Sequence, residues 1–291
     1  MSFKKKAEER TKGRLKIEVY PNGSLFKDKE IHIARSQGMV EMGINGLAWM
    51  AESLPLSLAL ASGVIYSSRE QFWRCADGDL GKMWAKELET KLNTKLLSFM
   101  SHGPSRVLVC TKKLIREPGD LKGLRWRAPG IAFEQYFLSL GVSPVRMSVS
   151  DVYIAMERGT IDGVASSDRA YRSFKWHEVA RYLTDFTVDS DNAVAVAINL
   201  ATWNKLPGDI QKILLELAEE LSEWSKTESY RLSDENWKVI RQLPNIEIYV
   251  MPPEKAKDWY DRTFPDQMLM IEKKLGKERT GQLAKILEKY R

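Results

Sequence analysis

The sequence predicts an α/β fold with two lobes. Segments in which apolar and polar residues alternate are separated by segments with helical spacing, an order of strands and helices typical of α/β proteins. The chain has 291 residues, which is enough for two lobes of ordinary domain size. The clearest helical pattern begins at Asp209 and continues to about Leu243, which is too long for one small lobe. We therefore expect this helix to brace both lobes.

The N-terminal elements are expected in the following order. Leu15, Ile17 and Val19 alternate with charged residues, which predicts a strand that ends at the Pro-Asn-Gly turn of residues 21–23. A short helix over 29–37 and a strand over 40–44 follow. The apolar stretch 47–66 contains proline and glycine and predicts a loop that lines a cleft. We then expect a long helix over 69–92, irregular at its glycines, and strands over 94–100 and 107–112.

The C-terminal elements are expected to continue this alternation. Residues 120–168 predict a strand with two arginines, a Pro-Gly break, a helix, a short strand, a second helix and the Asp162-Gly163 turn. Ile246, Ile248 and Val250 predict a late strand, and residues 255–290 a helical region with a break at 263–266. Strands that alternate with helices at this spacing predict largely parallel sheets.

The composition argues against several classes of protein. The formal net charge is +6, but the basic residues are mostly spread along the chain, whereas a nucleic-acid-binding protein concentrates them. Cys75 and Cys110 lie far apart and in no motif, so we expect two buried thiols and no disulfide. The three histidines lack the spacing of a zinc site, and we expect neither a metal nor another cofactor. The longest apolar stretch is too short to span a membrane.

Three blocks of the sequence together resemble one protein family. The segment DLKGLRWRAPGIAFEQYFLSLGVSPVRMSVSDVYIAMERGTIDGVASSD at 120–168 resembles the signature region of the dicarboxylate-binding type of solute-binding proteins of TRAP transporters (tripartite ATP-independent periplasmic transporters). RTKGRLKIEVYPNGSLFKDKE and NAVAVAINLATWNKLPGDIQKILLELAEE resemble two other blocks of this family, in the same order along the chain. The resemblance covers essentially the whole chain.

The resemblance implies both a fold and a function. The fold would be the two-lobed kind of periplasmic binding proteins, of the class II type, with crossings between the lobes near residues 101–105 and 189–192. The first lobe would take residues 1–101 and 191–228, and the second lobe 102–190 and 229–291. The protein would be a monomer that captures a small carboxylate and delivers it to TRAP transporter membrane subunits, and it would not be an enzyme.

Arg127 is the first candidate for a ligand-binding residue. In LRWRA, the apolar side chains point one way and Arg125 and Arg127 the other. A guanidinium offers a planar fork of donors that matches a carboxylate. Periodicity alone favours two solvated charges on an edge strand. The resemblance assigns the carboxylate to Arg127 and leaves Arg125 structural or solvated.

The other candidates depend more strongly on the resemblance. Ser166 stands where the family has an Asn that contacts the ligand, so the identity of the ligand is not carried over. Arg106 is either a second donor to the ligand or a charge on the hinge surface. Trp49, Tyr66 and Trp176 are expected in the loops that close the cleft, and we expect Asp162 to be a turn former.

The N-terminus departs from the family pattern. The family begins with a strand and part of a helix before the position of Met1. Met1 to Lys16 is basic, but no apolar segment follows, so the chain lacks the features of a signal peptide. We therefore expect the N-terminus to be truncated and the first strand of the first lobe to be missing, while the resemblance implies a periplasmic location.

Two alternatives to a transport protein remain open. An enzyme that acts on an acidic metabolite, or a ligand-sensing module, would have the same cleft. The sequence also leaves open whether the acid is a C4-dicarboxylate, a keto acid, a sugar acid or an aromatic acid.

Overall fold

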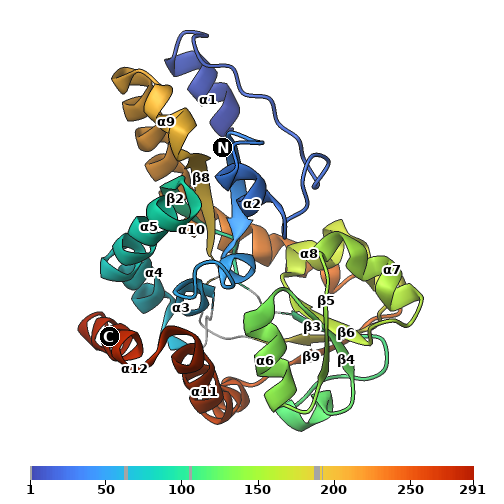
Figure 1. Ribbon diagram of the computed structural model, residues 1–291. Helices are drawn as coiled ribbons and strands as arrows, with labels where there is room; N and C mark the ends of the chain where they lie inside the picture. Colours follow the sequence, from blue (N-terminus) through green and yellow to red (C-terminus); the bar gives the residue numbers. More distant parts are fainter. Residues whose placement is uncertain (1, 62–64, 105–106, 187–190, 192) are drawn as a thin grey trace.

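The computed structural model describes residues 2–61, 65–104, 107–186, 191 and 193–291, and it contains two sheets in two lobes (Figure 1). We define the first lobe by the three-stranded sheet β1-β8-β2, and the second lobe by the six-stranded sheet β5-β4-β6-β3-β7-β9. The predicted two-lobed α/β architecture is confirmed. No helix of the described residues has both the length and the apolar character needed to cross a membrane.

The helices and strands alternate along most of the chain. Their bounds are α1 Phe3–Arg10, α2 Ile31–Ser36, β1 Met42–Gly46, η1 Leu47–Met50, α3 Ser57–Ala61, α4 Arg69–Asp77, α5 Asp79–Leu92, β2 Thr94–Ser101, β3 Val107–Cys110, η3 Pro118–Leu121, β4 Arg125–Ala128, α6 Ile131–Ser139, β5 Ser143–Arg146, η4 Val149–Asp151, α7 Val152–Glu157, β6 Gly163–Ser166, α8 Asp168–Ser173, η5 Trp176–Glu178, β7 Tyr182–Asp185, β8 Ala193–Asn199, α9 Leu200–Lys205, α10 Gly208–Ile240, β9 Glu247–Val250, α11 Pro253–Leu275 and α12 Lys277–Lys289.

Both sheets depart from the prediction of largely parallel strands. In the first lobe, β8 lies between β1 and β2 and is antiparallel to both. In the second lobe, β4 is parallel to β5 and β6, while β3 is antiparallel to β6 and β7, and β9 is parallel to β7. The sheets are therefore mixed. The alternation of strands and helices could not reveal this, because β8 and β3 enter their sheets directly from the crossings between the lobes.

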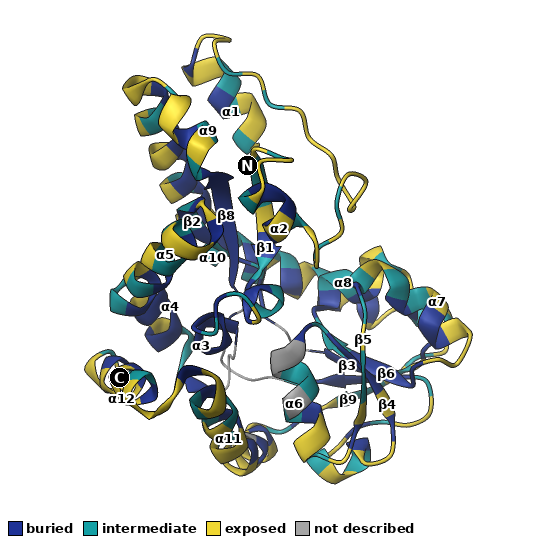
Figure 2. Ribbon diagram, viewed as in Figure 1, coloured by how far each residue is buried: buried dark blue, intermediate teal, exposed yellow. Residues whose placement is uncertain are grey.

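Each sheet has an apolar core on both of its faces. One core of the first lobe joins α3, α4 and α5 to β8, and the other joins α1, α9 and α10 to the opposite face. In the second lobe, α7 and the end of α10 cover one face, and α6 and α11 the other. Figure 2 shows the strands as mostly buried and the outer helical faces as exposed. Cys75 and Cys110 are buried, free thiols, as predicted.

The predicted brace is the 33-residue helix α10. Leu214 and Leu217 near its beginning pack in the first lobe, whereas Trp237 and Ile240 at its end pack in the second. Between these two apolar regions, α10 buries a series of serines at helical spacing, namely Ser222, Ser225, Ser229 and Ser233. Small hydroxyl side chains at these positions allow the backbone of the crossings to approach the helix, and they supply hydrogen bonds there.

The strand predicted for Leu15 to Val19 does not form. This segment has no regular structure, no strand of the described residues pairs with it, and Val19 is 62% exposed. The backbone of Ile17 is bonded by side chains of α1 instead: its N–H donates to Glu8 Oε1 at 3.0 Å, and its carbonyl accepts from Lys4. An alternating pattern yields a strand only where a neighbouring strand supplies partners.

The C-terminal region differs from its prediction in two ways. Helix α11 continues through Pro265, and the break comes at Gly276, where a φ of +80° suits glycine. In addition, α12 packs on α4 and α5, and Leu283 and Ile286 belong to the core of the first lobe. The division of the chain into lobes by residue number stays a prediction. These contacts favour assigning the end of the chain to the first lobe.

Because His32 is buried, we expect the protein to lose stability in acid. Burial, together with the positive charge of Arg35 and against the opposing effect of Glu52, lowers the pKa of His32 to about 4. Since the unfolded histidine titrates near 6.5, the unfolded chain binds more protons as the pH falls from about 6.5 to about 4. We expect this difference to cost roughly 2–3 kcal/mol of unfolding free energy over that window. Urea unfolding of the wild type and of His32→Gln at pH 7.5 and 4.5 measures it, and an identical pH dependence of both proteins would contradict it.

Candidate functional site

Arg127 lies on β4 with the orientation that the alternation predicted. Trp126 and Ala128 point into the core shared with α6 and α11, whereas Arg127 projects from the other face of the sheet. It is 5% exposed, and its Nε donates to the carbonyl of Met147 at 3.1 Å. Within the described residues this is the one hydrogen bond of the guanidinium, so its Nη groups are available to a ligand.

The charge of Arg127 survives its burial. Burial lowers the pKa of the guanidinium to about 10, and the negative charge of Asp28 opposes this shift. At neutral pH the group is therefore a cation in a site where little water competes for it. A fixed cation of this kind binds an anion more strongly than an exposed arginine does.

Arg125, the neighbouring arginine, has a structural role. Its Nη2 and Nε donate to the two carboxylate oxygens of Asp162 at 2.7 and 3.2 Å, and its backbone N–H donates to Oδ2 at 2.8 Å. Burial alone would raise the pKa of Asp162, but the hydrogen bonds from Arg125 and Lys112 outweigh it and lower the pKa to about 2. Asp162 therefore fixes the beginning of β4 against the bend that precedes β6.

The first lobe presents Trp49 and Asp28 near Arg127. Trp49, in η1, is half-buried and donates its Nε1 proton to Asp28 Oδ2 at 3.1 Å. The backbone N–H of Lys29 donates to Asp28 Oδ1 at 3.0 Å. Trp49 was predicted for the cleft. Asp28 was missed, because it belongs to an irregular segment in which no periodicity distinguishes one side chain from another.

The two lobes contact each other around this point. Lys27 pairs with Asp151 at 3.2 Å, and Arg146 pairs with Glu52. Both ion pairs join the first lobe to residues near Met147, whose carbonyl accepts the hydrogen bond from Arg127. Arg146 precedes Met147 at the end of β5, and Asp151 follows it at the end of η4. The two ion pairs therefore link the lobes next to the site that contains Arg127.

The backbones of the two lobes approach each other closely at Gly130, which precedes α6. A Cβ atom on Gly130 would lie 2.7 Å from the carbonyl oxygen of Ala48, and its φ of +149° also disfavours other residues. We expect Gly130→Ala to hold the lobes apart and to weaken ligand binding about tenfold or more, because fewer molecules reach the closed state. Titration calorimetry with an acid that binds the wild type measures this loss of affinity.

Gly159→Ala is the matched control for that substitution. Gly159 also has a positive φ, +64°, but a Cβ atom there would meet nothing within 4 Å. Alanine at position 159 strains the backbone but causes no clash between the lobes. The affinity of this variant for the acid should therefore equal that of the wild type. Equal losses in both variants would contradict the role of Gly130 in closure.

Of the two polar candidates Ser166 and Arg106, the structure describes only Ser166. Ser166 ends β6, which pairs with β4 so that Arg127 lies opposite Val164. Side chains alternate along a strand, so Ser166 and Val164 share the face from which Arg127 projects. Ser166 is half-buried and stays a candidate. Arg106 lies outside the described residues, and its role stays a prediction.

Tyr66 and Trp176 differ from the cleft position predicted for them. Tyr66 is 3% exposed, donates its hydroxyl proton to the carbonyl of Ala59 at 2.8 Å and packs edge-on against Phe72. Trp176 is fully buried in the core of the second lobe and stacks on Phe174. Aromatic residues suit a core and a ligand wall equally well, so the sequence could not separate the two roles.

The hinge between the lobes contains a buried polar cluster centred on Asp191. Its carboxylate accepts hydrogen bonds from Trp73 Nε1 at 2.9 Å and from Ser101 Oγ at 2.9 Å, and Arg69 lies 3.5 Å from it. Ser101 also contacts α10: its backbone N–H donates to Ser225 Oγ, and its hydroxyl bonds Ser229 Oγ. Asp191 and Ser101 thus tie both crossings to α4 and α10.

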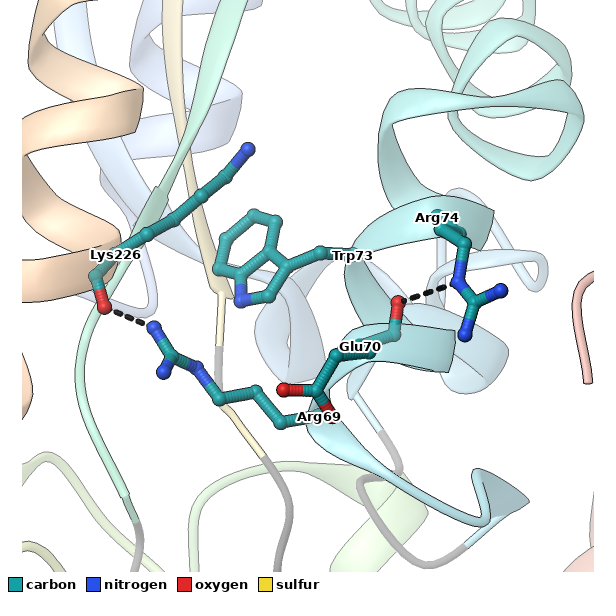
Figure 3. A pocket seen from close by; sticks show the side chains of 5 residues that line it. All are labelled: Arg69, Glu70, Trp73, Arg74 and Lys226. Carbon is teal, nitrogen blue, oxygen red and sulfur yellow. Dashed lines mark hydrogen bonds between the residues drawn. The ribbon is translucent and has the colours of Figure 1, made fainter.

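A shallow pocket of about 430 Å³ lies beside this cluster, and Arg127 is not among the residues that line it (Figure 3). Its cations already have partners. Lys226 pairs with Asp77 and Glu223 at 2.6 Å and lies over the ring of Trp73, and Arg69 lies over the ring of Tyr230. We therefore regard the pocket as the outer surface of the hinge. The described residues contain no cluster of three or more His, Cys, Asp or Glu that could hold a metal ion.

Comparison with known proteins identifies the family. Residues 1–273 match the family of bacterial extracellular solute-binding proteins, family 7. A solute-binding protein of Roseobacter denitrificans is 29% identical over 217 residues, which is 74% of this chain and 66% of that protein. Its crystal structure with bound L-galactonate has a TM-score of 0.81 and 25% identity, and covers 90% of this chain and 86% of that chain.

Two further comparisons cover more of the chain. The C4-dicarboxylate-binding periplasmic protein DctP of Rhodobacter capsulatus is 26% identical over 276 residues, which is 93% of this chain and 81% of that protein. A TRAP periplasmic solute-binding protein of Haemophilus influenzae, solved with bound L-gulonate, has a TM-score of 0.88 at 22% identity and covers 99% of this chain and 92% of that chain. The last of these comparisons supports the fold.

Proposed function

Because the chain belongs to the bacterial extracellular solute-binding proteins of family 7, we propose that it captures a small organic acid between its two lobes and delivers it to the membrane subunits of a TRAP-type transporter. The buried guanidinium of Arg127 is the observation that carries this proposal. Among the described residues it has one hydrogen bond, to the carbonyl of Met147, and it keeps its charge, so it offers its remaining donors to a carboxylate.

Closure of the lobes couples binding to delivery. A ligand stabilises the closed form only through contacts that the open form lacks. A carboxylate on Arg127 that also touches the Trp49 side of the first lobe makes such contacts. The membrane subunits would then recognise the closed form. The complex with L-galactonate of the Roseobacter relative supports an acid as the ligand.

We further propose that the protein releases its solute unchanged, without covalent chemistry, and acts as a monomer. Membership of the family supports a periplasmic location. Ser166 and the indole of Trp49 shape the site around the acid, and Arg106 is a second candidate donor.

A thermal-shift screen with carboxylic acids tests the proposal, because a ligand that binds only the folded protein raises its melting temperature. The panel should contain C4-dicarboxylates, sugar acids, keto acids and aromatic acids. For each acid that stabilises the protein, calorimetry should give one site per chain, and the acid should be recovered unchanged. Stabilisation by none of the four classes, or turnover of an acid, would overturn the proposal.

A further inference from the structure

Asp28 is an acidic residue in a site that is proposed to bind an acid. Its segment, 27–29, is held in place on both sides: Lys27 pairs with Asp151 at 3.2 Å, and Trp49 donates to Asp28 Oδ2 at 3.1 Å. Asp151 lies four residues after Met147, the residue that anchors Arg127. These contacts place a fixed carboxylate on the first lobe beside the guanidinium of the second lobe, and its charge acts on Arg127.

The carboxylate of Asp28 retains capacity to accept hydrogen bonds. Trp49 uses one position on Oδ2, and the N–H of Lys29 uses one on Oδ1 at 3.0 Å. An ionised carboxylate accepts about four hydrogen bonds and donates none. A solute in contact with Asp28 must therefore offer a hydroxyl or an ammonium proton at that point, because a second carboxylate there would be repelled.

Apart from Arg106, which lies outside the described residues, the charges around Arg127 do not compensate a second acid. Lys27 is paired with Asp151, and Arg146 is shared by Glu52 and Glu134. The negative charge of Asp28 acts on Arg127. Among the described residues near this site, Lys27, Arg146 and Arg127 thus each interact with an acid before any solute arrives.

We propose that Asp28 is a specificity-determining residue that selects acids with one carboxylate and a neighbouring hydroxyl or ammonium donor over dicarboxylates that lack such a donor. This inference rests on the proposed function and narrows its ligand class. In the complex, Arg127 binds the carboxylate of the solute while Asp28 accepts a proton from its donor group. The two side chains come from different lobes, so such a solute also links the lobes in the closed form.

Titration calorimetry with D-gluconate and glutarate tests this selectivity. Gluconate has one carboxylate and several hydroxyls, whereas glutarate has two carboxylates and no hydroxyl. We expect the wild type to bind gluconate at least about tenfold more tightly than glutarate, because like charges repel across the site. Asp28→Asn should reduce this ratio to about threefold or less, through weaker gluconate binding, stronger glutarate binding or both.

Two further variants make the test specific. Glu41→Gln removes one negative charge from an exposed position of the same lobe and should leave the ratio unchanged. Trp49→Phe removes the indole donor that orients Asp28 and should lower the ratio in part, which provides a second measurement if Asp28→Asn folds poorly.

Each outcome of this titration has a defined meaning. A wild type that binds glutarate as tightly as gluconate, or an Asp28→Asn protein with an unchanged ratio, would overturn the assignment of Asp28 and leave the proposed function intact. Failure of the wild type to bind these two acids and every acid of the thermal-shift panel would instead overturn the proposed function.

Discussion

Replacing Arg127 by alanine is expected to weaken binding of the acid by about 2–5 kcal/mol, which is roughly 30- to 5,000-fold in Kd. The guanidinium is 5% exposed, so in the closed site water cannot replace its hydrogen bonds to the carboxylate. Arg127→Lys keeps the charge but loses the planar fork, and its affinity should lie between those of wild type and Arg127→Ala. Calorimetry with the acid that stabilises the wild type most strongly measures all three proteins.

Arg125→Ala is the matched control for Arg127→Ala. Arg125 lies two residues away on the same strand, but among the described residues its guanidinium donates to Asp162 and not to Met147. Its removal should lower stability and leave the affinity within about threefold of the wild type. An Arg127→Ala protein that binds as tightly as Arg125→Ala would show that the acid is held elsewhere.

Asp191→Ala is expected to lower the free energy of unfolding by about 3–5 kcal/mol, which is typical of removing one partner from a buried ion pair. The carboxylate is 3% exposed and accepts from both Trp73 and Ser101, whose hydrogen-bonding groups would be left without it. Asp191→Asn keeps an acceptor oxygen and should lose less. Urea unfolding followed through tryptophan fluorescence measures the difference.

Asp77→Ala provides the comparison for Asp191. Asp77 is an acid on α4 that pairs with Lys226, but its side chain is 49% exposed. A surface pair of this kind contributes at most about 1 kcal/mol. If both substitutions cost the same, the hinge cluster would not be the structural centre that its buried contacts indicate.

The parts of the fold that the sequence predicted are those with strong local periodicity. The apolar spacing of α10 predicted its position and its role between the lobes. The alternation of LRWRA predicted that Arg127 and Trp126 point to opposite faces. The buried serines of α10 also follow helical spacing, and this signal could have indicated where the crossings approach the helix.

The sequence-based predictions that failed have a common physical cause. In each case, the contacts that decide the structure join the residue to others that its local sequence pattern does not reveal. The alternation of residues 15–19 predicted a strand, but pairing depends on a partner that the local pattern does not contain. Tyr66 and Trp176 are aromatic and apolar, and only their packing against Phe72 and Phe174 shows that they belong to cores. Asp28 is recognised as part of the site only through its hydrogen bond from Trp49, which lies 21 residues away in the sequence.

The comparison of an acid with its neutral amide, such as D-gluconate with D-gluconamide, tests the central claim most directly. Shape and hydroxyl groups are nearly the same in both, so their affinity ratio isolates the contribution of the carboxylate. The wild type should prefer the acid by about 100-fold or more, and in Arg127→Ala this preference should fall to nearly one. An acid-to-amide ratio that is the same in both proteins would contradict the assignment of the carboxylate to Arg127.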